Sequence, residues 1–287
     1  MLPELFLSLH FVFPELIMKH CRLVKYQLPL PDHTCTKELS DTRVLHISYF
    51  TDLHSCCSDR EKSEFMRILK HSAPDIVLCG GDSIVAIPGE SVLPAVGFLE
   101  SIASEYPLYI GTGNHEYRAR LYPETYGTMY EEYRKALDDV NCQLLENTDC
   151  RISLKGIPVR ICGFDMPAHY YSRFHNQAVP VRELQQVFGD CDDTFFTILL
   201  AHHPKMMHPA FTWGADLTLC GHYHGGIMRF GDHRGLISPD LRPFPGNAYG
   251  HFQSGKKHAI ISSGCGEHSI PVRISNPREI VSLSITV

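Results

Sequence analysis

Leu108-Tyr109-Ile110 leads within three residues to Gly113-Asn114-His115-Glu116, and this stretch decides the fold. The apolar part has the length of a short buried strand. The polar part places an amide, an imidazole and a carboxylate side by side after a glycine. Such a cluster is typical of a loop at the end of a strand that presents polar atoms to a ligand.

Four further apolar runs end in polar clusters of the same kind. These clusters are Asp52-Leu53-His54, Gly80-Gly81-Asp82, Ala201-His202-His203-Pro204 and Gly221-His222-Tyr223-His224. In α/β sheets, ligands gather beyond the carboxyl ends of the strands, so loops that are distant in sequence meet there. We therefore expect the five clusters to form one site.

The segments around these clusters alternate between strand and helix patterns. Strands are expected at 44–50, 75–79, 107–110, 151–154, 159–163, 195–200, 217–220, 258–262 and 280–287. Helices are expected at 60–71, 91–104, 124–140 and about 181–188. This alternation, with strands concentrated in the second half, predicts an α/β sandwich of mixed sheets.

Composition supports one large domain at 43–287. The 287 residues are 44% hydrophobic and 20% charged, with no linker or repeat that would divide them. The net charge of −6, without a basic stripe, argues against a nucleic-acid partner. The eleven cysteines show no C-x-x-C spacing, which favours free thiols and a cytoplasmic location.

Residues 1–42 form an N-terminal extension in this interpretation. Its apolar run at 5–13 is too short to span a bilayer, which needs about 20 residues. It also lacks the basic start and cleavage site of a signal peptide. A helix packed on the body, a poorly ordered extension and peripheral attachment to a membrane surface remain as alternatives. Residues 28–32 are expected to be extended.

The converging clusters have the composition of a metal site. Oxygen and nitrogen ligands without a thiolate suit Mn, Fe or Zn better than Ca or Mg. Seven candidates are too many for one tetrahedral ion and fit two ions that share a carboxylate. Two adjacent ions indicate hydrolysis of a phosphate ester by a bridging hydroxide. The candidates are Asp52, His54, Asp82, Asn114, His202, His222 and His224.

The ordered motifs D-x-H, G-G-D, G-N-H-E, H-x-P and G-H-x-H resemble the calcineurin-like metallophosphoesterase superfamily over 44–287. Gly225-Gly226 and Ile270-Pro271-Val272-Arg273 further resemble its bacterial branch of YkuE-like and YaeI-like phosphodiesterases. The resemblance implies a four-layer α/β/β/α sandwich of two mixed sheets flanked by helices. It makes residues 43–287 a metallophosphoesterase domain.

The resemblance also distributes the roles. It assigns Asp52, His54 and His224 to the first metal, Asn114, His202 and His222 to the second, and Asp82 to both. His115 becomes the catalytic residue, which assists the leaving group without binding metal. The H-x-P pattern favours His202 as the ligand and places His203 near the rim. Two roles fit Glu116 equally well, namely orienting His115 and capping the loop.

The expected activity is hydrolysis of phosphodiester or pyrophosphate bonds with two divalent ions, Mn being favoured in vitro. Some relatives in this branch cleave the pyrophosphate of UDP-diacylglucosamine, so a lipid-linked substrate at a membrane surface is the alternative to a small-molecule one. A catalytically silent scaffold fits less well, because all eight positions are present. Candidate substrate contacts are Tyr117, Arg118, Arg120, His169, Tyr170, Tyr171, Arg173, His251 and Arg273.

Overall fold

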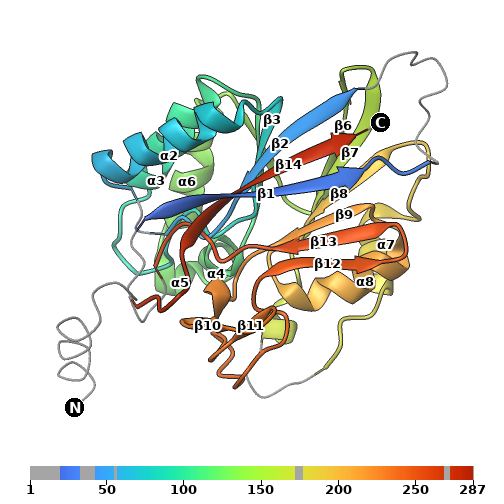
Figure 1. The fold of residues 1–287 in the computed structure, drawn as a ribbon. Coiled ribbons are helices and arrows are strands. Elements are labelled where there is room, and N and C mark those ends of the chain that lie inside the picture. Colours follow the sequence, from blue (N-terminus) through green and yellow to red (C-terminus); the bar gives the residue numbers. More distant parts are fainter. Residues whose placement is uncertain (1–19, 33–42, 55–56, 172–176, 268–271, 287) are drawn as a thin grey trace.

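The computed structural model describes residues 20–32, 43–54, 57–171, 177–267 and 272–286 (Figure 1). Residues 1–19, on which the packed-helix and membrane-attachment interpretations depend, lie outside this range. None of the helices in the described residues combines the length and the apolar content of a membrane span.

The first sheet has six strands in the order β1-β14-β2-β3-β4-β5. They are β1 (Cys21–Pro29), β14 (Arg278–Thr286), β2 (Val44–Phe50), β3 (Ile76–Cys79), β4 (Leu108–Gly111) and β5 (Cys142–Leu145). The run from β2 to β5 is parallel, whereas β14 is antiparallel to β2 and parallel to β1. The sheet is therefore mixed.

The second sheet also has six strands, in the order β12-β13-β9-β8-β7-β6. They are β12 (Gly250–Ser254), β13 (Lys257–Ile261), β9 (Leu217–Cys220), β8 (Phe196–Leu200), β7 (Ile157–Gly163) and β6 (Thr148–Leu154). The four central strands are parallel and the two outer strands are antiparallel to their neighbours. A short ribbon of β10 (Arg229–Phe230) and β11 (Arg234–Gly235) follows β9.

Helices cover the outer face of each sheet (Figure 1). The first sheet carries α2 (Asp59–Ser72), α3 (Leu93–Ala103) and α6 (Met129–Asp138), and the second carries α7 (Arg182–Phe188) and α8 (Met207–Trp213). Two more helices, α4 (Asn114–Leu121) and α5 (Pro123–Tyr126), precede α6. These layers confirm the predicted α/β/β/α sandwich.

Each central strand packs on both of its faces, because successive side chains point alternately to the opposite sheet and to the helices. In β3, Ile76 and Leu78 contribute to the core between the two sheets, whereas Val77 and Cys79 pack under the helices of the first sheet. In β8, Leu199 faces α7 and α8 while its neighbours face the other sheet. Because successive side chains of a strand point to opposite faces, a strand buried on both faces needs a continuous apolar run.

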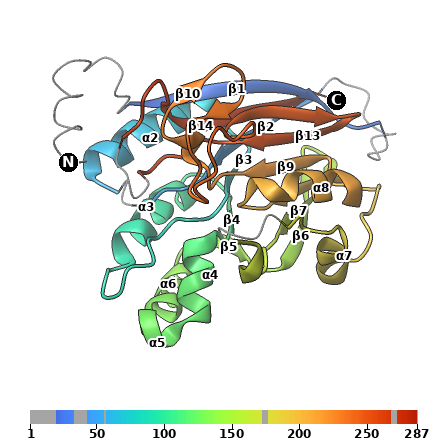
Figure 2. The same cartoon turned by 90° about the horizontal axis from the view of Figure 1, so that it is seen from below.

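The N-terminal part of the fold differs from the sequence expectation. Cys21–Pro29 form β1, which pairs along its whole length with β14. These residues are expected to belong to an extension before the domain, but they complete the first sheet. Figure 2 shows β1 on the opposite side of the molecule from α5. Only Leu28 of this strand is buried, so its apolar signal is too weak to predict a strand.

The region after the opening motif also differs. The helix expected at 124–140 is two helices, α5 and α6, because the chain turns at Gly127 with a φ of 61°. The motif Gly113-Asn114-His115-Glu116 is the start of α4 and not a loop. Strands β5 and β12 and helix α8 were not predicted.

Candidate metal centre

The five polar clusters meet at the carboxyl ends of neighbouring strands in both sheets. Asp52 and His54 follow β2, Asp82 follows β3, and Asn114 begins α4 just after β4. From the second sheet, His202 follows β8, and His222 and His224 follow β9. The structure therefore brings together all seven predicted ligands. Their roles as ligands stay a prediction.

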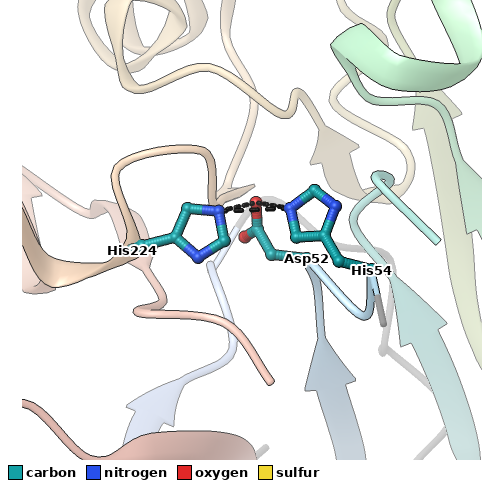
Figure 3. Close-up of side chains that lie close together, drawn as sticks. All are labelled: Asp52, His54 and His224. Carbon is teal, nitrogen blue, oxygen red and sulfur yellow. Dashed lines mark hydrogen bonds and ion pairs between the residues drawn. The ribbon is translucent and has the colours of Figure 1, made fainter. Parts of the chain in front are cut away.

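The first group consists of Asp52, His54 and His224, whose donor atoms lie within 4.8 Å of one another. Figure 3 shows the Asp52 carboxylate beside the two imidazole rings. His224 Nε2 is 3.2 Å from Asp52 Oδ1 and 3.2 Å from His54 Nε2. Two imidazole nitrogens that face each other so closely need a proton or a cation to share, which fits a metal ligand pair.

The second group consists of Asp82, His202 and His222, again within 4.8 Å. His202 donates Nδ1–H to the Gly80 carbonyl at 3.0 Å, so Nε2 is the nitrogen that faces Asp82, 3.0 Å away. A hydrogen bond of this kind fixes the tautomer that a metal requires. Asn114 lines the same cavity as His222, and its buried Oδ1 has no hydrogen-bond partner among the described residues. An orphaned buried oxygen fits a bound cation.

Asp82 lies between the two groups. Its Oδ2 is 3.0 Å from His202 Nε2 in the second group and 3.8 Å from His54 Nε2 in the first. This position matches the carboxylate that the resemblance assigns to both ions. The donor set of oxygens and imidazole nitrogens suits two divalent cations.

The electrostatics of the site favour cations. Burial raises the pKa of Asp52 and Asp82, but the neighbouring histidines outweigh burial and hold both well below their ordinary values. Burial lowers the pKa of His202, yet Asp82 and Asp52 raise it to about 10. Burial also lowers the pKa of His54 to about 3, which leaves its lone pair free. The two buried carboxylates thus attract positive charge.

Five of the seven candidate ligands have a left-handed backbone. Their φ values are 54° for Asp52, 45° for His54, 52° for Asp82, 66° for His222 and 46° for His224. This conformation costs a non-glycine residue on the order of 1–3 kcal/mol and is concentrated at functional sites. Hydrogen bonds between the loops hold it, since Asp52 N–H donates to Gly81 O and His54 N–H to Asp82 O.

Glu116 caps the loop and does not orient His115. Its buried carboxylate accepts hydrogen bonds from the backbone N–H groups of Asp82 at 2.9 Å, Ser83 at 2.7 Å and Gly113 at 3.0 Å. It therefore ties the loop after β3 to the start of α4. Gly113 is needed there because a side chain would collide with the Asp82 carboxylate.

His115 is oriented by a backbone amide. Ala86 N–H donates to His115 Nδ1 at 2.8 Å, and the Arg118 guanidinium is 3.2 Å from the same nitrogen. Neutral His115 therefore carries its proton on Nε2. Burial lowers the pKa of His115 to about 4, so the neutral form dominates at pH 7. The amide of Ala86 offers no side-chain signal, so sequence reasoning missed it.

A cavity of about 300 Å³ adjoins the metal centre. Its lining includes Asn114, His115 and His222 together with three predicted substrate contacts, Tyr117, Arg118 and Tyr171.

Two of the remaining predicted contacts already have protein partners. Arg120 is paired with Glu146 and Asp165. Arg273 is buried behind the site, where it donates to the Ser263 carbonyl. Arg173 lies outside the described residues.

His203 is buried and does not lie at the rim as expected. Its Nε2 is 3.2 Å from Asp240 Oδ2, and its Nδ1 accepts from Lys205 N–H at 3.0 Å. Asp240 is 6% exposed and lines the cavity, but sequence reasoning missed it. It follows Ser238-Pro239 in a turn and no apolar strand precedes it directly, so the strand-end pattern could not find it.

A family model described as calcineurin-like phosphoesterase matches residues 43–226, which contain all seven candidate ligands. The chain belongs to this family. The family is one of phosphoesterases, and the Asp and His groups described above suit divalent metal binding.

Relatives of this chain occur in several bacteria. A metallophosphoesterase of Helicobacter pylori is 30% identical over 217 residues, covering 74% of this chain and 51% of the relative. Metallophosphoesterase YkuE of Bacillus subtilis is 24% identical over 225 residues, covering 76% of this chain and 70% of the relative. The chain thus spans about half the length of the Helicobacter relative.

Solved structures support the fold. The 5'-nucleotidase precursor from Thermus thermophilus aligns with a TM-score of 0.50 and 11% identity, covering 85% of this chain and 54% of that chain. At this identity the likeness concerns the fold alone.

Proposed function

We propose that this phosphoesterase hydrolyses phosphodiester or pyrophosphate bonds at a centre of two divalent ions. The observation that carries the proposal is the position of Asp82 between two groups of buried ligands, with Asn114 Oδ1 left without a partner in the described part of the chain. Asp52, His54 and His224 would hold one ion, Asn114, His202 and His222 the other, and Asp82 both.

When bound, two such ions supply a hydroxide nucleophile near neutral pH and neutralise the phosphoryl oxygens for in-line displacement. The chain itself supplies His115. Its Nε2–H, fixed by the Ala86 amide at Nδ1, is available to donate to the departing ester oxygen or to a phosphoryl oxygen. Arg118 beside it adds positive charge at the cavity wall.

The cavity supports a diester over a monoester. A diester or pyrophosphate carries a second group on the phosphorus, which needs space beyond a closed phosphate pocket. The cavity of about 300 Å³ next to His115 offers this space. The Asp240 carboxylate in the same wall would repel the dianion of a monoester more than the single charge of a diester. The substrate is proposed to be a small molecule.

The test uses metal-stripped protein reconstituted with Mn, Fe or Zn. We expect two ions per chain by elemental analysis and turnover of bis-p-nitrophenyl phosphate at least about 10-fold faster, in kcat/KM, than of p-nitrophenyl phosphate. No rate above buffer with two ions bound would favour a silent scaffold. Faster turnover of the monoester would contradict the diester assignment.

One observation favours the lipid-linked alternative. Exposed apolar side chains follow cavity-lining residues in the sequence, with Leu241 60% exposed next to Asp240 and Phe244 57% exposed in the same loop. Exposed apolar groups beside a site suit an acyl chain or a membrane surface. The same assay decides the matter when it includes a UDP-diacylglucosamine-type pyrophosphate and its deacylated form. A clear preference for the acylated form would select the lipid-linked substrate.

A further inference from the structure

Asp240 connects two buried histidines beside the metal centre. Its Oδ2 is 3.2 Å from His203 Nε2, and its Oδ1 is 3.6 Å from His222 Nε2. The rings of His203 and His222 are 4.5 Å apart between centroids. All three residues are buried, so the carboxylate interacts with these rings in a water-poor environment.

Asp240 lies in a tight turn that holds its carboxylate in position. Arg242 N–H donates to Ser238 Oγ at 3.3 Å and Leu241 N–H donates to Ser238 O at 2.9 Å, which closes a tight turn around Asp240. The turn lies between Ile237 and Pro243, which form an isolated antiparallel β-bridge. The position of the carboxylate is therefore fixed by hydrogen bonds within the turn and does not depend on a flexible chain.

His203, His222 and Asp240 also have the spacing of a third metal site, but hydrogen bonding argues against one. Lys205 N–H donates to His203 Nδ1 at 3.0 Å, so neutral His203 carries its proton on Nε2, the nitrogen that faces Asp240. A protonated nitrogen has no lone pair for a cation. His203 is thus a donor to Asp240, and the pair is a hydrogen-bonded support for His222.

We propose that Asp240 is a positioning residue for the metal centre, which directs His222 through its Nε2 while His203 holds the carboxylate in place. His222 Nε2 is buried, faces Asp240 and has no hydrogen-bond partner within the residues that the structure describes. A carboxylate behind a ligating imidazole fixes the ring and raises its basicity, and losing one typically costs 10–100-fold in metal affinity. The inference rests on the metal centre of the proposed function but not on its substrate.

The experiment measures stepwise binding of Mn to metal-stripped protein by calorimetry, without substrate. For Asp240→Asn we expect two ions to bind still, one of them about 10- to 100-fold more weakly and the other unchanged. At saturating Mn, kcat should return to near the wild-type value, because the carboxylate acts through the ligand. Leu241→Ala, in the same turn but 60% exposed, is the matched control and should bind both ions normally.

Two results would overturn the inference. The first is that Asp240→Asn binds both ions with wild-type affinity. The second is that Asp240→Asn loses one ion as completely as His222→Ala does, which would make Asp240 a direct ligand. If Asp240→Asn does not fold, His203→Gln keeps the carboxylate and should weaken the same ion by a smaller factor. Wild-type affinity in that variant would also overturn the inference. A wild-type protein that binds fewer than two ions would instead contradict the proposed function.

Discussion

At the scale of single residues, the site places unlike groups a few ångströms apart and gives them separate tasks. Asn114, His115 and Glu116 are consecutive, yet their side chains differ in role. Asn114 has a buried Oδ1 without a partner among the described residues, His115 is held by Ala86 and lines the cavity, and Glu116 turns back to accept from backbone amides. The first turn of α4 makes this division possible, because successive side chains of a helix point about 100° apart.

This division predicts different consequences for two substitutions. Asp82→Asn removes charge from the carboxylate shared by both groups, so metal binding and activity should fall together, activity by about 1,000-fold. His115→Ala should keep two ions and lose about 100- to 1,000-fold in kcat, as expected when a preorganised hydrogen-bond donor to the reacting oxygens is removed. Elemental analysis and bis-p-nitrophenyl phosphate turnover of both variants give the comparison. Equal metal loss in the two would refute the separate roles.

Much of the site was predictable from sequence because ligand side chains follow apolar strands. Asp52, Asp82 and His202 each come just after such a run. The supporting groups gave no such signal. Ala86 acts through its backbone, and Asp240 lies in a turn away from any strand end. The left-handed backbone of the ligands was equally hidden, because it is imposed by contacts between loops and opposes local preference.

At the scale of elements, β1 is the part of the fold whose contribution can be isolated. It is an edge strand in which only Leu28 is buried, while most residues of β14 beside it are buried. Its main task is therefore to cover the edge of β14. An uncovered edge of an apolar strand pairs readily with other chains.

A truncation tests this role. A protein that begins at residue 31 lacks β1, and we expect it to form soluble aggregates, because the N–H and C=O groups along β14 lose their partners. A protein that begins at residue 20 keeps β1 and is the matched control. Size-exclusion chromatography with light scattering distinguishes them. Two monodisperse proteins of equal thermal stability would show that β1 is dispensable.

The elements that sequence predicted are those with strong apolar runs, such as β2, β8 and β9. Those that it missed owe their structure to neighbours. Strand β5 takes its conformation from pairing with β4, and β12 from pairing with β13. Such pairing overrides weak local preference and cannot be read from one segment alone.

At the scale of the whole molecule, burial within the layered fold raises the pKa of cysteine thiols and so disfavours their ionised form. Burial raises the pKa of Cys142 in β5 and of Cys150 in β6 to about 11 from an ordinary value of 9.0. Both are free thiols, as the sequence analysis predicted. Folding favours their protonated form, so the stabilisation is complete below about pH 9 and is lost as the pH rises toward 11.

Alkylation measures this effect. At pH 8, iodoacetamide should modify Cys142 and Cys150 of the native protein about 10- to 100-fold more slowly than in urea, because the thiolate is the reactive form. The native rate should keep rising up to about pH 11, whereas the unfolded rate should level off near pH 9 to 10. Peptide mapping by mass spectrometry follows each thiol separately. Equal native and unfolded rates at pH 8 would contradict the raised pKa values.

The pairing of β1 with β14 also determines when β1 can pair during synthesis of the chain. Pro29 ends β1, and Arg278, 249 residues later, begins its partner. At 5–20 residues per second, a ribosome needs about 12–50 s to make that interval. The first strand must therefore wait, unpartnered, for the last. Arg22 and Lys25 within it are charged residues of the kind that keep a waiting strand from joining a neighbouring chain.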